Sequence, residues 1–202
     1  MIAERKQYLG KALKNYLEAM KFDASFAASS SSSSSTKTLI FRVMTLWFEN
    51  SEDKEISQLV DSNYREIPPH VFLPVISQLT AQLEGGEART PGEQLFQNTL
   101  TKIVGRVSQN HPFHTVYCLL AIVNANKDQK DFKEAPDQRM KTARGILNHL
   151  MTKGLKSEID SMSLVCDAMI ETAYLPVPKD RRGNGPYPFP RETLVGKLKD
   201  IR

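Results

Sequence analysis

Residues 110–126 read Asn-His-Pro-Phe-His-Thr-Val-Tyr-Cys-Leu-Leu-Ala-Ile-Val-Asn-Ala-Asn, and this stretch decides the fold class. Pro112 fixes φ near the helical value and lacks an N–H that the first helical position does not need, so it can start a helix that Asn110 or His111 caps. The apolar side chains that follow cover one wide face, and they are Val116, Tyr117, Leu119, Leu120 and Val123. A helix with such a face is buried on more than one side, so we expect it to lie inside an array of helices.

Other segments show the spacing of apolar side chains, three or four residues apart, that is typical of helices. They cover residues 3–22, about 38–50, 51–67, 72–83, 90–109, 140–153 and 157–173. No segment shows a convincing strand or hairpin pattern, and most connections are short. The sequence therefore predicts an all-α fold, an α-solenoid of about eight helices stacked as antiparallel pairs in the manner of HEAT or TPR repeats. No strict period of residue identities marks a tandem consensus repeat.

Several of these helices carry a start or stop signal. Thr90-Pro91-Gly92-Glu93 is a capping box with proline at the first helical position. We expect Ser51 to begin one helix, Pro74 to lie in the first turn of another, and Gly154 to cap a third. The candidate core anchors are Trp47 and the stripe Phe72–Leu79.

Composition divides the chain into four parts. Residues 1–25 form the first helix, residues 26–37 a serine-rich flexible loop, residues 38–175 the helical-repeat segment and residues 176–202 a basic, proline-rich linker. The loop contains the serine run Ser29–Ser35, which offers too little apolar surface to offset the entropy cost of ordering the chain. Recurrent prolines make the linker extended.

The net charge of +4 lies entirely in residues 176–202, where basic side chains exceed acidic ones by four. A nucleic-acid-binding domain spreads Lys and Arg over a folded face with stacking aromatic rings, whereas Tyr187 and Phe189 alternate with prolines here. We therefore expect no direct binding of nucleic acid. We expect no membrane partner either, because no apolar run approaches the roughly 20 residues that span a bilayer.

The sequence contains no pattern that points to chemistry. It has neither a glycine-rich phosphate-binding loop nor a His-Glu-x-x-His motif. His111 and His114 can share a helix face, but a zinc site needs three or four protein ligands, so we expect them to cap or to hydrogen-bond in the core. Asp160 and Asp167 also share a face, and we expect them to be solvated. We therefore assign no catalytic, cofactor-binding or metal-binding residue.

The two cysteines indicate the compartment. Cys118 and Cys166 lie in apolar helical runs, and neither has a neighbouring base in sequence. We expect buried, reduced thiols, as in a cytosolic or nuclear protein.

Three separated blocks resemble a known family. They are Leu46-Trp47-Phe48-Glu49-Asn50-Ser51, then Phe72-Leu73-Pro74 with Gln78-Leu79, then His111-Pro112-Phe113-His114-Thr115 running to Asn124-Ala125-Asn126-Lys127-Asp128. In that order and spacing they are similar to the C-terminal part of the FAT domain of the phosphatidylinositol 3-kinase-related protein kinases. Residues 4–12 and the closing Leu198-Lys199-Asp200 extend the resemblance over nearly the whole chain. The serine run is the departure from the family pattern.

This resemblance implies a non-catalytic scaffold segment that positions the kinase domain of the same polypeptide. It implies a parent serine/threonine protein kinase that forms homodimers and signals DNA double-strand breaks in the nucleus, with the cytoplasm as a second location. ATP and Mg would be bound in the parent's kinase domain, toward which residues 176–202 would lead and which this chain does not contain. Two alternatives stay open: a free-standing α-solenoid adaptor that binds a protein partner, and an unrecognised helical enzyme.

Overall fold

The structure, a computed structural model, describes residues 2–26, 33–83, 90–125 and 138–174. Its elements are α1 (Ile2–Phe26), α2 (Ser33–Glu49), α3 (Lys54–Asn63), the 3₁₀ helix η1 (Pro69–Val75), α4 (Ile76–Ala81), α5 (Pro91–Asn110), α6 (Pro112–Val123), α7 (Gln138–Leu150), the π-helical turn η2 (Met151–Leu155) and α8 (Lys156–Ala173). These ranges contain helices and no strand, so the predicted all-α class is confirmed.

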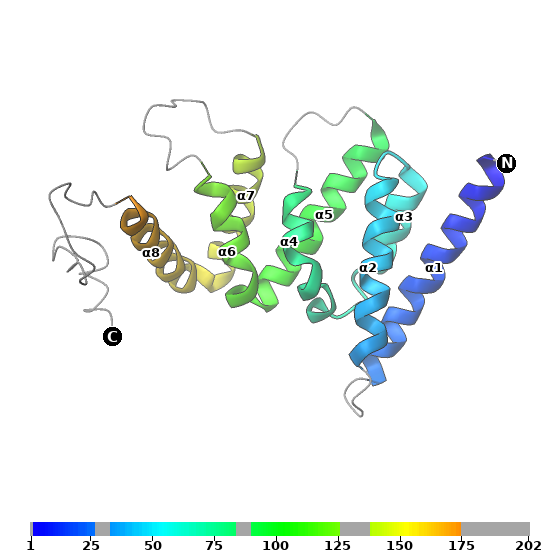
Figure 1. Cartoon of the computed structure of the whole chain (residues 1–202), viewed down its shortest axis with the longest axis horizontal. Helices are drawn as coiled ribbons and strands as arrows, with labels where there is room; N and C mark the ends of the chain where they lie inside the picture. Colours follow the sequence, from blue (N-terminus) through cyan, green and yellow to red (C-terminus); the bar gives the residue numbers. More distant parts are fainter. Residues whose placement is uncertain (1, 27–32, 84–89, 126–137, 175–202) are drawn as a thin grey trace, which may run out of the picture.

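The helices stand side by side in one row, from α1 at one end to α8 at the other (Figure 1). Consecutive helices such as α1 and α2, or α6 and α7, pack against each other and run in opposite directions. Alternate helices also touch, α3 against α5 and α5 against α7, which links each pair to the next. This is the stack of antiparallel pairs that the sequence predicted.

The core extends along the whole row, where the helix faces meet. Its largest fully buried side chains are Trp47, Phe72, Leu13, Leu17, Met20, Ile40, Met44, Ile56, Ile67, Leu79, Leu83 and Leu100. Both predicted anchors are confirmed: Trp47 is 0 % exposed, and the Phe72–Leu79 stripe buries Phe72, Val75, Ile76 and Leu79. Burial of each such apolar side chain contributes roughly 1.5–3 kcal/mol.

Two predicted helix starts are confirmed. The Thr90 hydroxyl accepts a hydrogen bond from the Glu93 N–H (3.1 Å), and the Glu93 carboxylate accepts one from the Thr90 N–H (3.0 Å), which completes the capping box. Pro112 occupies the first position of α6. His111 holds the cap position but makes no side-chain capping bond, and the Asn110 amide donates to the Arg106 carbonyl at 2.8 Å.

Three predicted helix boundaries were wrong. The cap of α3 is Asp53, not Ser51, since the Asp53 carboxylate accepts the Glu55 N–H at 2.9 Å. Helix α2 begins at Ser33, five residues before the predicted start, so the last serines of the run are helical. Pro74 lies inside η1 and α4 begins only at Ile76. The ring of Pro74 disfavours α geometry in the preceding residue, so this segment closes with tighter 3₁₀ bonds.

One side chain of the predicted apolar face lies at the surface, and so does an apolar side chain of α8. Tyr117 is 43 % exposed, because the buried stripe of α6 runs through Thr115, Val116, Leu119, Leu120 and Ile122 instead. Met169 on α8 is 68 % exposed. Helix α8 is the last of the described row, so neighbours cover only part of it (Figure 1).

A glycine separates the last two helices as predicted. Gly154 has φ 96°, the only positive φ among the described residues, and it interrupts the helical backbone between α7 and α8. Glycine enters this region without the steric cost that a Cβ imposes. Of the predicted serine-rich loop 26–37, residues 27–32 lie outside the described residues, and so does the predicted linker 176–202.

Candidate functional site

The buried tryptophan joins three helices. Its indole Nε1 donates a hydrogen bond to the Ser57 hydroxyl of α3 at 3.2 Å, and both groups are fully buried. Its ring lies 4.7 Å from that of Phe96 on α5 and 5.9 Å from that of Phe48, measured between centroids. Tilted aromatic pairs at such distances contribute about 0.5–1.5 kcal/mol beyond the area they bury. Trp47 thereby fixes α2, α3 and α5 relative to one another.

Polar contacts hold α5 against α3. The Arg106 guanidinium donates to the carbonyls of Tyr64 (2.7 Å) and Ile67 (2.8 Å), both in the turn that follows α3. Asp61 of α3 accepts from Lys102 at 2.9 Å and from the Thr99 hydroxyl at 3.1 Å. These bonds join residues about forty positions apart in sequence, as expected for contacts between neighbouring repeats.

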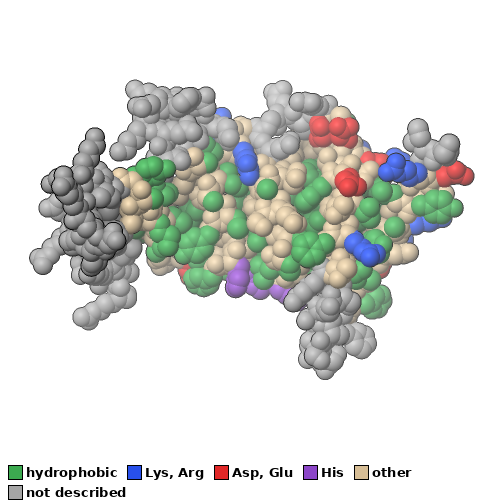
Figure 2. Space-filling model, viewed as in Figure 1, with side chains coloured by type: hydrophobic (Ala, Val, Ile, Leu, Met, Phe, Trp, Pro, Cys, Tyr) green, Lys and Arg blue, Asp and Glu red, His purple; other side chains and the backbone are tan. Residues whose placement is uncertain are grey.

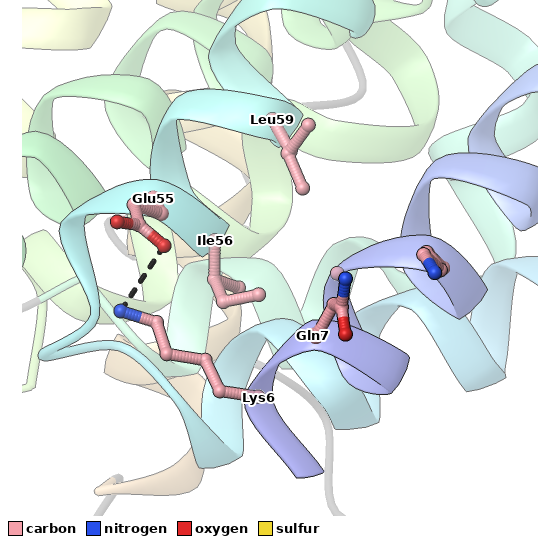
Figure 3. Close-up of a pocket in the computed structure, with 7 residues that line it drawn as sticks. Lys6, Gln7, Glu55, Ile56 and Leu59 are labelled. Atoms are coloured by element: carbon pink, nitrogen blue, oxygen red, sulfur yellow. Dashed lines mark ion pairs between the residues drawn. The ribbon is translucent and has the colours of Figure 1, made fainter. Parts of the chain in front are cut away.

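A shallow cavity of about 370 Å³ lies between α1 and α3 (Figure 3). Lys6 reaches from α1 across its rim to Glu55, at 3.1 Å, and also to Asp53, at 3.1 Å. Hydrogen bonds to Glu55 and Asp53 raise the pKa of Lys6. Burial by itself would raise the pKa of Asp53, but the bonds from Lys6 and two backbone N–H groups hold it below its ordinary value. The charges of Lys6 and Glu55 on its rim are paired with each other, and we assign this cavity no ligand.

The two histidines of the opening stretch lie together beside a third. The rings of His111 and His114 meet edge to face, with centroids 6.4 Å apart. Burial, helped by His70 and His114, lowers the pKa of His111, so its imidazole is neutral at pH 7. In the part of the chain that the structure describes, no group of three or more His, Cys, Asp or Glu has an arrangement that could hold a metal ion. That no residue binds a metal stays a prediction.

Neither cysteine is as deeply buried as predicted. Cys118 and Cys166 form no disulfide, have intermediate exposure and pack against the edge of the core. Burial raises the pKa of the Cys118 thiol, which is therefore protonated at neutral pH and a poor nucleophile. Asp160 is exposed and Asp167 is half-buried, so the two do not form a shielded carboxylate pair.

Sequence reasoning missed a groove between α5 and α7. It has a volume of about 590 Å³, and its lining residues are Tyr64, Thr101, Lys102, Gly105, Arg106, Gln109, Thr142, Gly145, Ile146 and His149. The signal was present in the sequence: no Asp or Glu occurs from Gln94 to Lys127, nor from Gln138 to Ser157. None of the described helices is long and apolar enough to cross a membrane.

Comparison with known proteins shows that the chain is similar in sequence to protein kinases. No protein-family model matches the chain. The chain is 26 % identical over 216 residues to the serine-protein kinase ATM of Sus scrofa, an alignment that covers 98 % of the chain and 7 % of that kinase. It is 30 % identical over 147 residues to the serine/threonine-protein kinase TEL1 of Cryptococcus neoformans, covering 73 % of the chain and 4 % of the kinase.

The fold has solved counterparts as well. The open conformation of CtTel1 superposes with a TM-score of 0.60 and 21 % identity, over 85 % of this chain and 6 % of that one. The complete CtTel1 dimer with C2 symmetry gives a TM-score of 0.59. The chain thus corresponds in sequence and in fold to a small part of much longer proteins.

Proposed function

This chain is homologous over most of its length to one segment of the ATM and Tel1 protein kinases, and from this premise we propose that it is a non-catalytic scaffold. It is the C-terminal part of the FAT domain of an ATM-like serine/threonine kinase. Within the predicted family, the blocks Leu46–Ser51 and His111–Asp128 resemble the ataxia-telangiectasia mutated kinase. The proposal rests on the similarity of the chain to the ATM and TEL1 kinases, whose lengths it covers to only 7 % and 4 %.

The scaffold acts mechanically. A helix stack holds an attached domain in place only if its helices do not slide past one another. Several contacts between the helices oppose such sliding. The buried Trp47–Ser57 bond joins α2 to α3, and the Lys102–Asp61 ion pair joins α5 to α3. The Arg106 bonds to two carbonyls join α5 to the turn that follows α3. Because packed interiors resist deformation, a stack with such ties holds an attached domain at a fixed place.

The partner of this scaffold is the kinase domain of the same polypeptide. That domain, and not this chain, binds ATP and Mg and transfers phosphate. The parent protein forms a homodimer, a proposal supported by the C2 symmetry described for the CtTel1 dimer. It signals DNA double-strand breaks in the nucleus, with a cytoplasmic pool as the second location.

Two experiments test this function. The open reading frame beyond Arg202 is expected to continue into a kinase domain. In the full-length parent, lysine cross-linking followed by mass spectrometry is expected to join this segment to that domain. Robust phosphate transfer by the purified chain alone would contradict the proposal.

A free-standing adaptor remains the second candidate, because the groove between α5 and α7 is left open by the described part of the stack. A stop codon directly after Arg202 would favour it over the kinase segment. Both candidates require the same fold, so the reading frame separates them without any change to the structural account.

A further inference from the structure

The groove between α5 and α7 is open because two glycines form part of its walls. A Cβ built on Gly105 or on Gly145 would meet no other atom within 4 Å, so both positions face empty space. A glycine in a helix interior costs about 0.5–1 kcal/mol relative to alanine. Helices α5 and α7 each have one such destabilising glycine at the groove. Glycine at such positions lets another backbone approach closely.

The groove is positively charged. Lys102 and Arg106 line it, and the exposed Lys141 of α7 is next in sequence to the lining residue Thr142. No carboxylate occurs on α7, or on α5 after its first turn. Asp61 of α3 is paired with the lining residue Lys102 at 2.9 Å.

Two of these cations have no carboxylate partner within the described part of the chain. The Arg106 guanidinium donates its hydrogen bonds to two backbone carbonyls. Because these acceptors are neutral, they leave its positive charge uncompensated. Lys141 is exposed and forms no ion pair with a described carboxylate. A binding partner that brings carboxylates would therefore gain favourable electrostatic energy, and the gain would rise as water leaves the groove.

The groove also offers apolar and polar contacts in the pattern that a helix needs. Ile146 and Tyr64 are 5 % exposed each and form the floor, while Thr101 and Thr142 provide hydroxyls on either wall. The lining of α5 runs from Thr101 to Gln109, about 12 Å at 1.5 Å per residue. That length matches two turns of a helix lying along the groove, the helix-in-groove mode of recognition.

We propose that this groove binds an acidic amphipathic helix of a partner protein, with an apolar side chain over Ile146 and carboxylates toward Lys102, Arg106 and Lys141. Nucleic acid fits less well. Single strands are bound by stacking their bases on exposed aromatic rings, and the one aromatic side chain of the groove, Tyr64, is almost fully buried. This inference does not depend on whether a kinase domain follows the chain.

Fluorescence anisotropy of the full 202-residue chain tests the proposal with two labelled peptides of the length of α5. The first peptide has leucines along one face and glutamates on the other, and the second replaces every glutamate with glutamine. We expect the acidic peptide to bind at least about tenfold more tightly, since several charge pairs are lost in the second. Equal binding of the two peptides, or no binding of the acidic one, would overturn the proposal.

Variants locate the site. Gly145→Leu fills the groove without meeting another atom at its Cβ, so the chain is expected to keep its circular dichroism spectrum and to lose about tenfold or more in affinity. Lys141→Glu is expected to weaken binding about threefold or more, whereas the matched charge change Lys14→Glu, on the distant α1, changes it less than about twofold. Equal effects of the two lysine variants would reveal non-specific attraction and refute a defined site. A single-stranded oligonucleotide that displaces the peptide, and whose binding Gly145→Leu also abolishes, would assign the groove to nucleic acid instead.

Discussion

Gly92 offers a sharp test of how the helices fit together, because the same substitution has opposite effects at two glycines of α5. A Cβ on Gly92 would overlap the carbonyl carbon and oxygen of Glu52 and would lie 3.1 Å from the Lys54 nitrogen. All three are backbone atoms, so no side-chain rotation can relieve the overlap. Gly105, in the middle of the same helix, has nothing within 4 Å of its Cβ position.

The magnitudes follow from this geometry. Non-bonded heavy atoms need about 3.5 Å or more, so Gly92→Ala must push the turn before α3 away from α5. Overpacking of a filled interior costs about 1–3 kcal/mol. Movement of that turn also disturbs the Asp53 cap, whose loss costs about 1 kcal/mol. We therefore expect Gly92→Ala to lower the free energy of unfolding by about 3 kcal/mol, and Gly105→Ala to raise it by about 0.5–1 kcal/mol.

Thermal unfolding followed by far-ultraviolet circular dichroism measures both variants. For a domain of this size, 1 kcal/mol shifts Tm by roughly 2–4 °C, so Gly92→Ala is expected to lower Tm by about 6–12 °C. Gly105→Ala is expected to raise it slightly. A Gly92→Ala chain as stable as the wild type would refute the close approach of α5 to the turn before α3.

Three further predictions concern the ties between helices. Trp47→Ala is expected to lower the free energy of unfolding by about 3–5 kcal/mol, whereas Phe41→Ala, at a 43 % exposed residue of the same helix, lowers it by less than about 1 kcal/mol. Urea unfolding is followed by circular dichroism, because Trp47 is the only tryptophan and its fluorescence is lost in the variant. A loss below about 1 kcal/mol for Trp47→Ala would contradict its burial. Arg106→Met leaves the carbonyls of Tyr64 and Ile67 without this donor, and it is expected to lower the free energy of unfolding by about 1–3 kcal/mol in the same assay. The control Arg144→Met changes an exposed arginine and leaves the urea midpoint unchanged. Equal midpoints for the two variants would count against the Arg106 bonds. Burial alone would raise the pKa of Asp61, but Lys102 and Thr99 hold this pKa below its ordinary value. The stability that Asp61 adds is therefore present above its unfolded pKa of about 3.9 and is lost as pH falls through its folded pKa. Asp61→Asn should lower the free energy of unfolding at pH 7 but have little effect at pH 2, and a loss of stability independent of pH would argue against the Lys102–Asp61 pair.

Features that depend on a few adjacent residues could be predicted from the sequence. The capping box at Thr90 closes through bonds between residues three apart, so its pattern is sufficient to specify it. The start at Pro112 is equally local, because the ring itself sets φ. The apolar stripes also predicted the helices of the described ranges and the burial of Trp47, since periodicity indicates the face that packs.

Features that depend on distant residues could not be predicted. Ser51 and Asp53 are both good cap residues, and the choice between them is made by contacts from elsewhere: Lys6 of α1 pairs with Asp53, and Gly92 of α5 packs on Glu52. The surface position of Tyr117 depends likewise on which helices flank α6. Local propensity is a weak prior that such tertiary contacts override.

The groove is the clearest case of this limit. Gly105 and Gly145 each read as a weak point in a helix, and nothing in their own surroundings suggests a site. They meet only because α5 and α7 stack as alternate helices of the row. The absence of acidic residues around both glycines could have raised the question, but only the stacking places the basic side chains along one cavity.

Kinase activity of the full-length parent, measured by phosphorylation of a peptide substrate, tests most directly the claim that this stack is a rigid support. The parent carrying Gly92→Ala is expected to lose activity as the contact between α5 and the turn before α3 loosens, while Gly105→Ala retains it. Full activity in a Gly92→Ala protein whose segment is demonstrably destabilised would contradict the account.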